Sequence, residues 1–106
     1  MYLTEPYYQG DTIGFYHEGD AVIDLDANPF KLLFYNAAAP KQRVAIDKSE
    51  MTQISPNKYY GEIPNTVTAL LQRGNYIMEQ LYGSNYTSIA KEEAFQLLDS
   101  QIKSEL

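Results

Sequence analysis

The stretch "LLQRGNYIMEQLYG", residues 70–83, decides which fold the chain is assigned. Its first residues complete a segment, 65–73, whose composition suits one or two helical turns. A helix is not expected to continue past Gly74, because glycine is a common helix terminator and the residues at 76–82 alternate in polarity. The sequence therefore predicts a short helical turn that stops at Gly74 and a strand directly after it.

Alternating apolar and polar residues recur along most of the chain. The clearest case is 30–36, where three large apolar residues fall on one face and the residues between them on the other. Further segments of this kind, separated by turn residues, are 11–20, 43–47, 51–55 and 58–64. Short strands that recur every ~8–12 residues are typical of sandwiches and barrels. We predict a single all-β sandwich domain over residues 1–106, with a hairpin loop at 83–87.

The C-terminal segment is compatible with two structures. Strong helix formers fill 88–104, and four apolar residues there fall on one helical face. As a strand, 94–99 would instead pair with 75–82 across the hairpin loop and cover an edge that otherwise stands open to other chains. We predict the strand, with fraying over the last few residues; a helix over 88–104 is the alternative.

The predicted core consists of the large apolar or aromatic residues on each alternating face, with one anchor from the helical turn. These are Ile13, Phe15, Leu25, Phe30, Leu32, Phe34, Ile63, Leu70, Tyr76, Met78 and Phe95. A chain of 106 residues is large enough for one modest core of this kind and not for two.

Composition excludes several classes of partner. Eight basic and fourteen acidic residues give a net charge of −6, which repels phosphate backbones and anionic lipid. The sequence has no cysteine, so disulfides, thiolate nucleophiles and thiolate zinc sites are excluded. The N-terminal residues lack the pattern of a cleaved signal, and no stretch has the ~20 apolar residues that span a bilayer. We expect no nucleic-acid partner, no membrane partner and no cleaved signal peptide.

Two patterns match metal or catalytic sites only in part. Asp24, Asp26 and Asn28 take the first, third and fifth positions of a calcium loop, but a proline and a tyrosine replace its glycine and its bidentate glutamate. We interpret these residues as solvated turn carboxylates. His17 is the only histidine, which excludes multi-histidine metal sites, and we expect it to be exposed at a strand end. No catalytic, cofactor-binding or metal residue is predicted.

The order of the predicted elements resembles that of the small immunoglobulin-like modules of tailed-phage and prophage proteins, such as the N-terminal domains of baseplate upper-protein subunits. The matching pieces are "QGDTIGF" (9–15), "IDLDANPFKLLFY" (23–35), "GEIPNTVTALLQRGNYIMEQLYG" (61–83) and "EEAFQLLDS" (92–100). The chain departs from these modules at Glu92 and Glu93, where they often have a glycine before the last strand. The resemblance implies an immunoglobulin-like antiparallel sandwich that docks other virion or tail subunits and has no chemistry or cofactor of its own. It also implies a location in the virion, or in the host cytoplasm during assembly.

The candidate interaction residues are the tyrosine pairs Tyr7 with Tyr8 and Tyr59 with Tyr60, since tyrosine is enriched in binding hot spots. Strands recruit tyrosine for packing more often than for binding, so packing in the core or at its rim is the commoner role of such residues. Two functions stay open: a non-enzymatic assembly module of a phage or prophage particle, with self-association not excluded, and a free-standing carbohydrate- or protein-binding sandwich that uses surface tyrosines. For the assembly module, the expected docking edges are the strand edges at 7–16 and 94–99.

Overall fold

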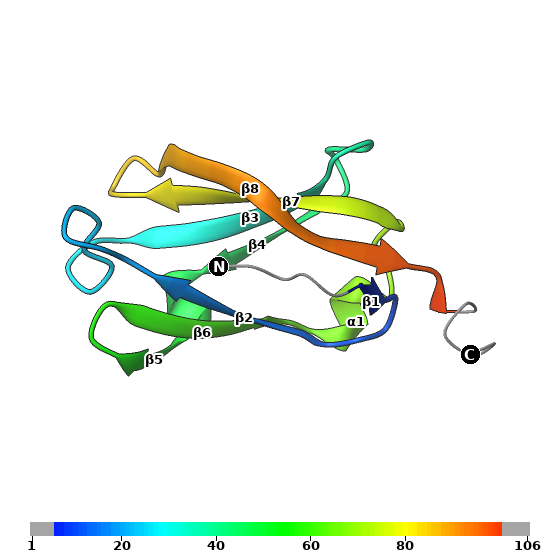
Figure 1. Ribbon diagram of the computed structural model, residues 1–106, viewed down its shortest axis with the longest axis horizontal. Coiled ribbons are helices and arrows are strands. Elements are labelled where there is room, and N and C mark those ends of the chain that lie inside the picture. Colours follow the sequence, from blue (N-terminus) through cyan, green and yellow to red (C-terminus); the bar gives the residue numbers. More distant parts are fainter. Residues whose placement is uncertain (1–5, 101–106) are drawn as a thin grey trace.

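A computed structural model describes residues 6–100. Within that range eight strands form two sheets that pack together, so the protein is all-β (Figure 1). The strands are β1 (Tyr7–Tyr8), β2 (Ile13–Glu18), β3 (Phe30–Asn36), β4 (Arg43–Asp47), β5 (Thr52–Ser55), β6 (Lys58–Ile63), β7 (Gly74–Tyr82) and β8 (Thr87–Leu98). The helical segments are the 3-10 helix η1 (Lys48–Glu50) and the α-helix α1 (Asn65–Thr68).

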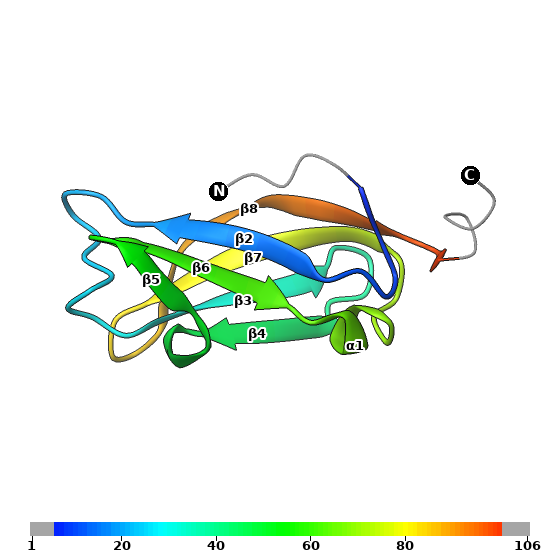
Figure 2. The same ribbon diagram turned by 90° about the horizontal axis from the view of Figure 1, so that it is seen from below.

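The larger sheet has the strand order β1-β8-β7-β3-β4 and is curled, and the smaller sheet has the order β2-β6-β5. Figure 2 shows the smaller sheet in front of the larger one. Neighbouring strands are antiparallel except β1 and β8, which are parallel and pair Tyr7 with Leu97 and Tyr8 with Leu98. The prediction of a wholly antiparallel sandwich is therefore wrong at this pair, because a strand of two residues leaves no alternation to read in the sequence.

The strands predicted from alternation are confirmed, with small changes at their ends. The opening stretch does contain a strand after the helical turn, and β7 begins at Gly74 itself. The C-terminal segment is a strand as predicted: β8 pairs with β7 from Thr87 to Leu97, and the helix alternative is wrong over this range. The predicted fraying of the last few residues falls largely outside the described residues.

A bulge in β8 shows how the strand accommodates its acidic segment. Tyr76 pairs with Phe95 and Ile77 with Glu93, so Ala94 is an extra residue in β8. Ala94 and Phe95 are consecutive, yet both are buried, whereas Glu93 is exposed. Phe95 stacks on Tyr76 with ring centroids 5.0 Å apart. The bulge therefore keeps the acidic residue in solvent while two neighbouring side chains enter the core.

The predicted core is confirmed except for one residue. The other ten predicted residues are buried, most of them between the two sheets. A smaller cluster of Leu25, Phe30 and Tyr59 closes the end of the sandwich beneath the β2–β3 loop. The prediction that Leu70 is buried is wrong: Leu70 is 84% exposed, and Leu71 is buried in its place.

The length of α1 explains this error. The helix ends at Thr68 and not at Gly74, so helical spacing does not extend to Leu70. Thr68 is fully buried, and its hydroxyl donates to the Asp11 carbonyl at 2.6 Å and accepts from the Gly10 N–H at 3.1 Å. These bonds attach the turn to the β1–β2 connection and fix which of its side chains face inward.

A buried polar corner joins the end of β3 to the start of β7. The amide of Asn36, which is 1% exposed, donates to the Arg73 carbonyl at 3.1 Å and to the Gln72 carbonyl at 3.4 Å. Its oxygen accepts from the Ala38 N–H at 2.9 Å. The Tyr76 hydroxyl donates to the Gln72 carbonyl at 2.5 Å. Asn36 leaves no room for a side chain at residue 74, where φ is +144°, so glycine is required there.

Candidate functional site

Tyr59 and Tyr60 of β6 do not form a shared platform, because consecutive strand residues point to opposite faces of a sheet. Tyr59 is 5% exposed and packs on Phe30, and its hydroxyl donates to the Asp26 carboxylate at 2.9 Å. Tyr60 lies on the outer face of the smaller sheet and is half-buried. Of this predicted pair, only Tyr60 is placed to meet a partner.

Tyr7 and Tyr8 lie in β1, at the edge of the larger sheet, and both are half-buried. The Tyr7 ring packs edge-on against Phe95 with centroids 6.1 Å apart. The backbone N–H of Tyr8 donates to the Asp11 carboxylate at 2.9 Å. The ring of Tyr7 therefore packs at the rim of the core, as the packing interpretation of the tyrosines states.

The outer face of the smaller sheet carries an aromatic pair that the sequence analysis missed. Tyr16 of β2 pairs across the strands with Tyr60, and their ring centroids are 5.3 Å apart. Tyr16 is 51% exposed, and the Lys58 ammonium lies 5.2 Å from the centre of its ring. The alternation of Tyr16 with the buried Phe15 is visible in the sequence, but the pairing with Tyr60 depends on the strand register.

The absence of a side chain at Gly14 lets the Tyr60 ring lie against the sheet. A Cβ added at Gly14 would lie 2.5 Å from the Tyr60 hydroxyl oxygen and 3.2 Å from the ring carbon that bears it. The phenol end of Tyr60 therefore occupies the space that a side chain at residue 14 would fill. The Tyr60 hydroxyl donates to the Glu62 carboxylate at 3.1 Å, which fixes the far end of the ring.

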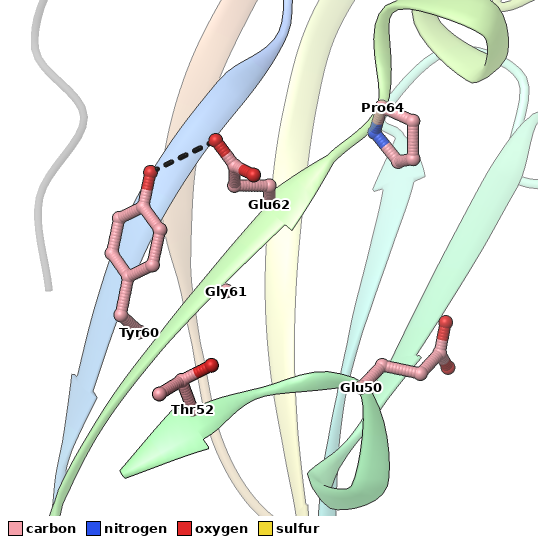
Figure 3. A pocket seen from close by; sticks show the side chains of 6 residues that line it. All are labelled: Glu50, Thr52, Tyr60, Gly61, Glu62 and Pro64. Atoms are coloured by element: carbon pink, nitrogen blue, oxygen red, sulfur yellow. Dashed lines mark hydrogen bonds between the residues drawn. The ribbon is translucent and has the colours of Figure 1, made fainter. Parts of the chain in front are cut away.

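A shallow depression of about 290 Å³ lies beside this tyrosine. Its lining residues are Glu50, Thr52, Tyr60, Gly61, Glu62 and Pro64. Figure 3 shows Tyr60 and Glu62 bonded to each other on one side, Glu50 on the other and Thr52 between them. Two of the lining residues are carboxylates and none is basic, so the depression is acidic and rich in hydrogen-bond acceptors.

The pKa of Tyr60 is raised above its ordinary value of 10.0, which keeps the phenol neutral and able to donate. The largest cause is loss of water around the ring, followed by the hydrogen bond to Glu62 and the charge of that carboxylate. The phenols of Tyr16 and Tyr7 make smaller contributions in the same direction.

His17 is buried, so the expectation of an exposed residue at a strand end is wrong. It is 3% exposed, and its ring lies 5.3 Å from that of Phe30. Removal of water lowers its pKa from 6.5 to about 4, because burial disfavours the charged imidazolium. His17 follows Ile13 and Phe15 on the same inward face of β2. This spacing of two residues in the sequence is the pattern that indicates burial of His17.

The residues of the partial calcium pattern are occupied in building the β2–β3 loop. Asp24 accepts from the backbone N–H groups of Asp26 and Ala27, both at 3.1 Å. The Asp26 carboxylate accepts from Gln53 at 2.9 Å, from the Asn57 N–H at 3.1 Å and from Tyr59. No group of three or more histidine, cysteine, aspartate or glutamate residues placed to hold a metal ion occurs within residues 6–100.

The two expected docking edges differ in the structure. β2 is an outer strand of the smaller sheet, as expected for the edge at 7–16. The closing strand is not open at its C-terminal end, because β1 pairs with Leu97 and Leu98 and the Gln9 N–H donates to the Leu98 carbonyl at 2.9 Å. The prediction of an open edge at 94–99 is therefore wrong for these two residues.

No helix in the described part of the chain is long and apolar enough to cross a membrane. Comparison with family models, with curated proteins and with solved structures finds no match to this chain.

Proposed function

We propose that the chain is an immunoglobulin-like domain that acts as a non-catalytic docking module of a tailed-phage or prophage particle, in its tail or baseplate. The proposal rests on the resemblance of the sequence to such modules and on the geometry of the sandwich. Its partners are other subunits of the particle, bound through the surface of the domain and not through a reaction.

The strand order supports the immunoglobulin-like assignment. Immunoglobulin domains place strands B, E and D in one sheet and G, F and C in the other. The orders β2-β6-β5 and β8-β7-β3 have this arrangement when the strands are matched in sequence. The parallel β1, beside β8, is then an additional edge strand before strand B.

The observation that carries the assignment is the hydrogen bond from Tyr76 to the Gln72 carbonyl. In immunoglobulin domains a tyrosine near the start of strand F donates to the backbone a few residues upstream, and the second cysteine follows it two residues later. Tyr76 lies near the start of β7 and makes such a bond. The cysteine position is taken by Met78, which is fully buried, so packing replaces the disulfide.

Two exposed apolar side chains are consistent with docking. Val22 in the β2–β3 loop is 83% exposed, and Leu70, between α1 and β7, is 84% exposed. Neither side chain contributes to the core, so both are available to a neighbouring subunit. The outer strands β2 and β5 of the smaller sheet have backbone groups that can pair with a partner strand.

Mass spectrometry of purified particles from the source phage or the induced prophage tests the function. We expect this polypeptide at a fixed ratio to the major tail proteins after extensive washing. Its absence from particles that are complete and infectious would overturn the proposal.

A free-standing module that binds carbohydrate or protein is the second candidate. The observation in its favour is the pair of Tyr16 and Tyr60 on the outer face of the smaller sheet. This candidate predicts no incorporation into particles and a saturable affinity for a soluble ligand that is lost in Tyr60→Ala. Glycan-array binding together with the particle analysis separates the two.

A further inference from the structure

The depression beside β6 combines an aromatic ring with two carboxylates. Its side-chain hydrogen-bonding groups are two carboxylates, one phenol and one threonine hydroxyl. A carboxylate has about four lone-pair sites. The Glu50 carboxylate accepts from the Asp47 N–H and the Glu62 carboxylate from the Tyr60 hydroxyl, so both have acceptor capacity left for a ligand. A ligand that fits this depression therefore supplies hydrogen-bond donors and positive charge.

The aromatic wall of the depression is held in place before any ligand arrives. The Tyr60 ring rests over Gly14 at one side and is tied to Glu62 through its hydroxyl. A ring held in this way loses little side-chain entropy when a second planar group stacks on it. The Lys58 ammonium over Tyr16 is an example, within the same face, of a cation held over a tyrosine ring.

A guanidinium group satisfies these conditions better than the other common ligands. It is planar, it carries five donors and no acceptor, and it both stacks on aromatic rings and bonds a carboxylate through two parallel N–H groups. An ammonium group can lie over a ring, as Lys58 does, but it is a compact point charge without the planar fork that bonds both oxygens of a carboxylate. A neutral sugar stacks on tyrosine and its hydroxyls can donate to carboxylates, but it brings no positive charge to offset the charges of Glu50 and Glu62.

We propose that the depression formed by Glu50, Thr52, Tyr60, Gly61, Glu62 and Pro64 receives an arginine side chain of a partner subunit. The guanidinium stacks on Tyr60, bonds the Glu62 carboxylate and is attracted by the charge of Glu50. This inference rests on the proposed docking function and adds the chemistry of the partner.

Chemical-shift titration of the ¹⁵N-labelled full chain tests the proposal with a blocked Gly-Arg-Gly peptide as the probe. Matched probes are the citrulline peptide, which has the same shape without the charge, the lysine peptide and maltotriose. We expect the arginine peptide to shift the amide signals of Thr52, Gly61 and Glu62 and to bind about fivefold more tightly than the lysine or citrulline peptide. Binding should weaken as salt is raised to about 0.3 M.

Two variants locate the site and one is a control. Glu62→Gln removes the charge at an exposed position, and Gly14→Ala displaces the Tyr60 ring while keeping every lining residue. Each should weaken binding of the arginine peptide at least about threefold. Glu93→Gln changes net charge equally on the other sheet and should leave binding unchanged. Equal binding of the citrulline peptide, tighter binding of maltotriose, or equal loss in Glu93→Gln would overturn the inference.

The peptide titration and the mass spectrometry of particles test separate claims. A chain that is present in particles but does not prefer the arginine peptide keeps its docking function and loses this site. A chain that is absent from particles loses the proposed function whatever the peptide result.

Discussion

His17 lies between the two sheets, where its ring packs on Phe30 and its folded-state pKa is about 4. In the unfolded chain the same imidazole titrates near 6.5. Between these values the unfolded chain binds a proton that the folded chain excludes. The stability that neutral His17 provides is therefore complete above pH 6.5 and is lost as the pH falls toward 4.

We predict that the free energy of unfolding falls by about 3 kcal/mol from pH 7 to pH 4 because of His17 alone. His17→Phe keeps an aromatic ring in this position and has no proton to bind, so its stability should be nearly constant over that range. Urea denaturation at several pH values measures both. The pKa of Asp20 is lowered from 3.8 by the N–H groups of Ile23 and Val22, so its effect falls below pH 4 in both proteins. Equal pH dependence in the two proteins would contradict the prediction.

The polar corner gives a second prediction at the same scale. Asn36→Ala removes the bonds to Gln72 and Arg73 and leaves buried polar groups without partners, so it should cost about 2–3 kcal/mol of stability. Tyr76→Phe should cost about 1 kcal/mol, because the Gln72 carbonyl still accepts from Asn36. Thermal and chemical denaturation of both variants check this order. A Tyr76→Phe loss larger than that of Asn36→Ala would show that the tyrosine bond holds the corner.

At the scale of the elements, the turn after α1 places two adjacent leucines in opposite environments. Leu71 is 6% exposed and Leu70 is 84% exposed. Leu71→Ala should lower the free energy of unfolding by about 2–4 kcal/mol, because it leaves a cavity in the core. Leu70→Ala should change it by less than about 0.5 kcal/mol. Similar losses in the two variants would mean that the turn presents a different face to the core.

Alternation predicted most of the strands because each of them buries one face. It identified β3 and β4 to the residue. The start of β7 was placed within one residue, because Gly74, which suggested the end of a helix, is the glycine that the corner requires. It did not predict the bulge at Ala94, since two neighbouring inward side chains contradict a period of two. β1 was missed as a separate strand because its pairing with β8 is set by the tertiary fold.

The candidate site was predictable only in part. Tyr60 was named from the sequence, whereas its neighbours Tyr16 and Lys58 come from β2 and β6 and are recognised only once the strand register is known. His17 was misjudged for a different reason: alternation along β2 places its side chain inward, but its polar atoms suggested exposure. For Tyr59 the packing interpretation describes the structure, because its ring is buried. The hydroxyl of Tyr59 reaches Asp26 from within the sandwich, which polarity alone does not reveal.

At the scale of the whole molecule, β1 joins the beginning of the described chain to its end. Removing residues 1–9 deletes the packing of Tyr7 on Phe95 and the bonds from Gln9 to Leu98 and Leu71. We predict a loss of about 2 kcal/mol in stability and concentration-dependent association through the newly exposed end of β8. A variant that lacks only residues 1–5 is the control, because it keeps the contacts named here.

Denaturation measures the loss of stability in the variant without residues 1–9, and light scattering after size-exclusion chromatography measures its association. If the variant without residues 1–9 is monomeric and equally stable, β1 is needed neither for stability nor for covering the end of β8.

The parallel pairing of β1 with β8 has a mechanical consequence. When the two ends of the chain are pulled apart, force enters β1 from its N-terminal side and leaves β8 from its C-terminal side. Parallel neighbours loaded in this way slide along each other, so their hydrogen bonds and the Tyr7 contact resist together and do not open one at a time. Survival under tension depends on the unfolding rate and not on the equilibrium stability. A domain with this arrangement resists a pulling force applied across β1 and β8.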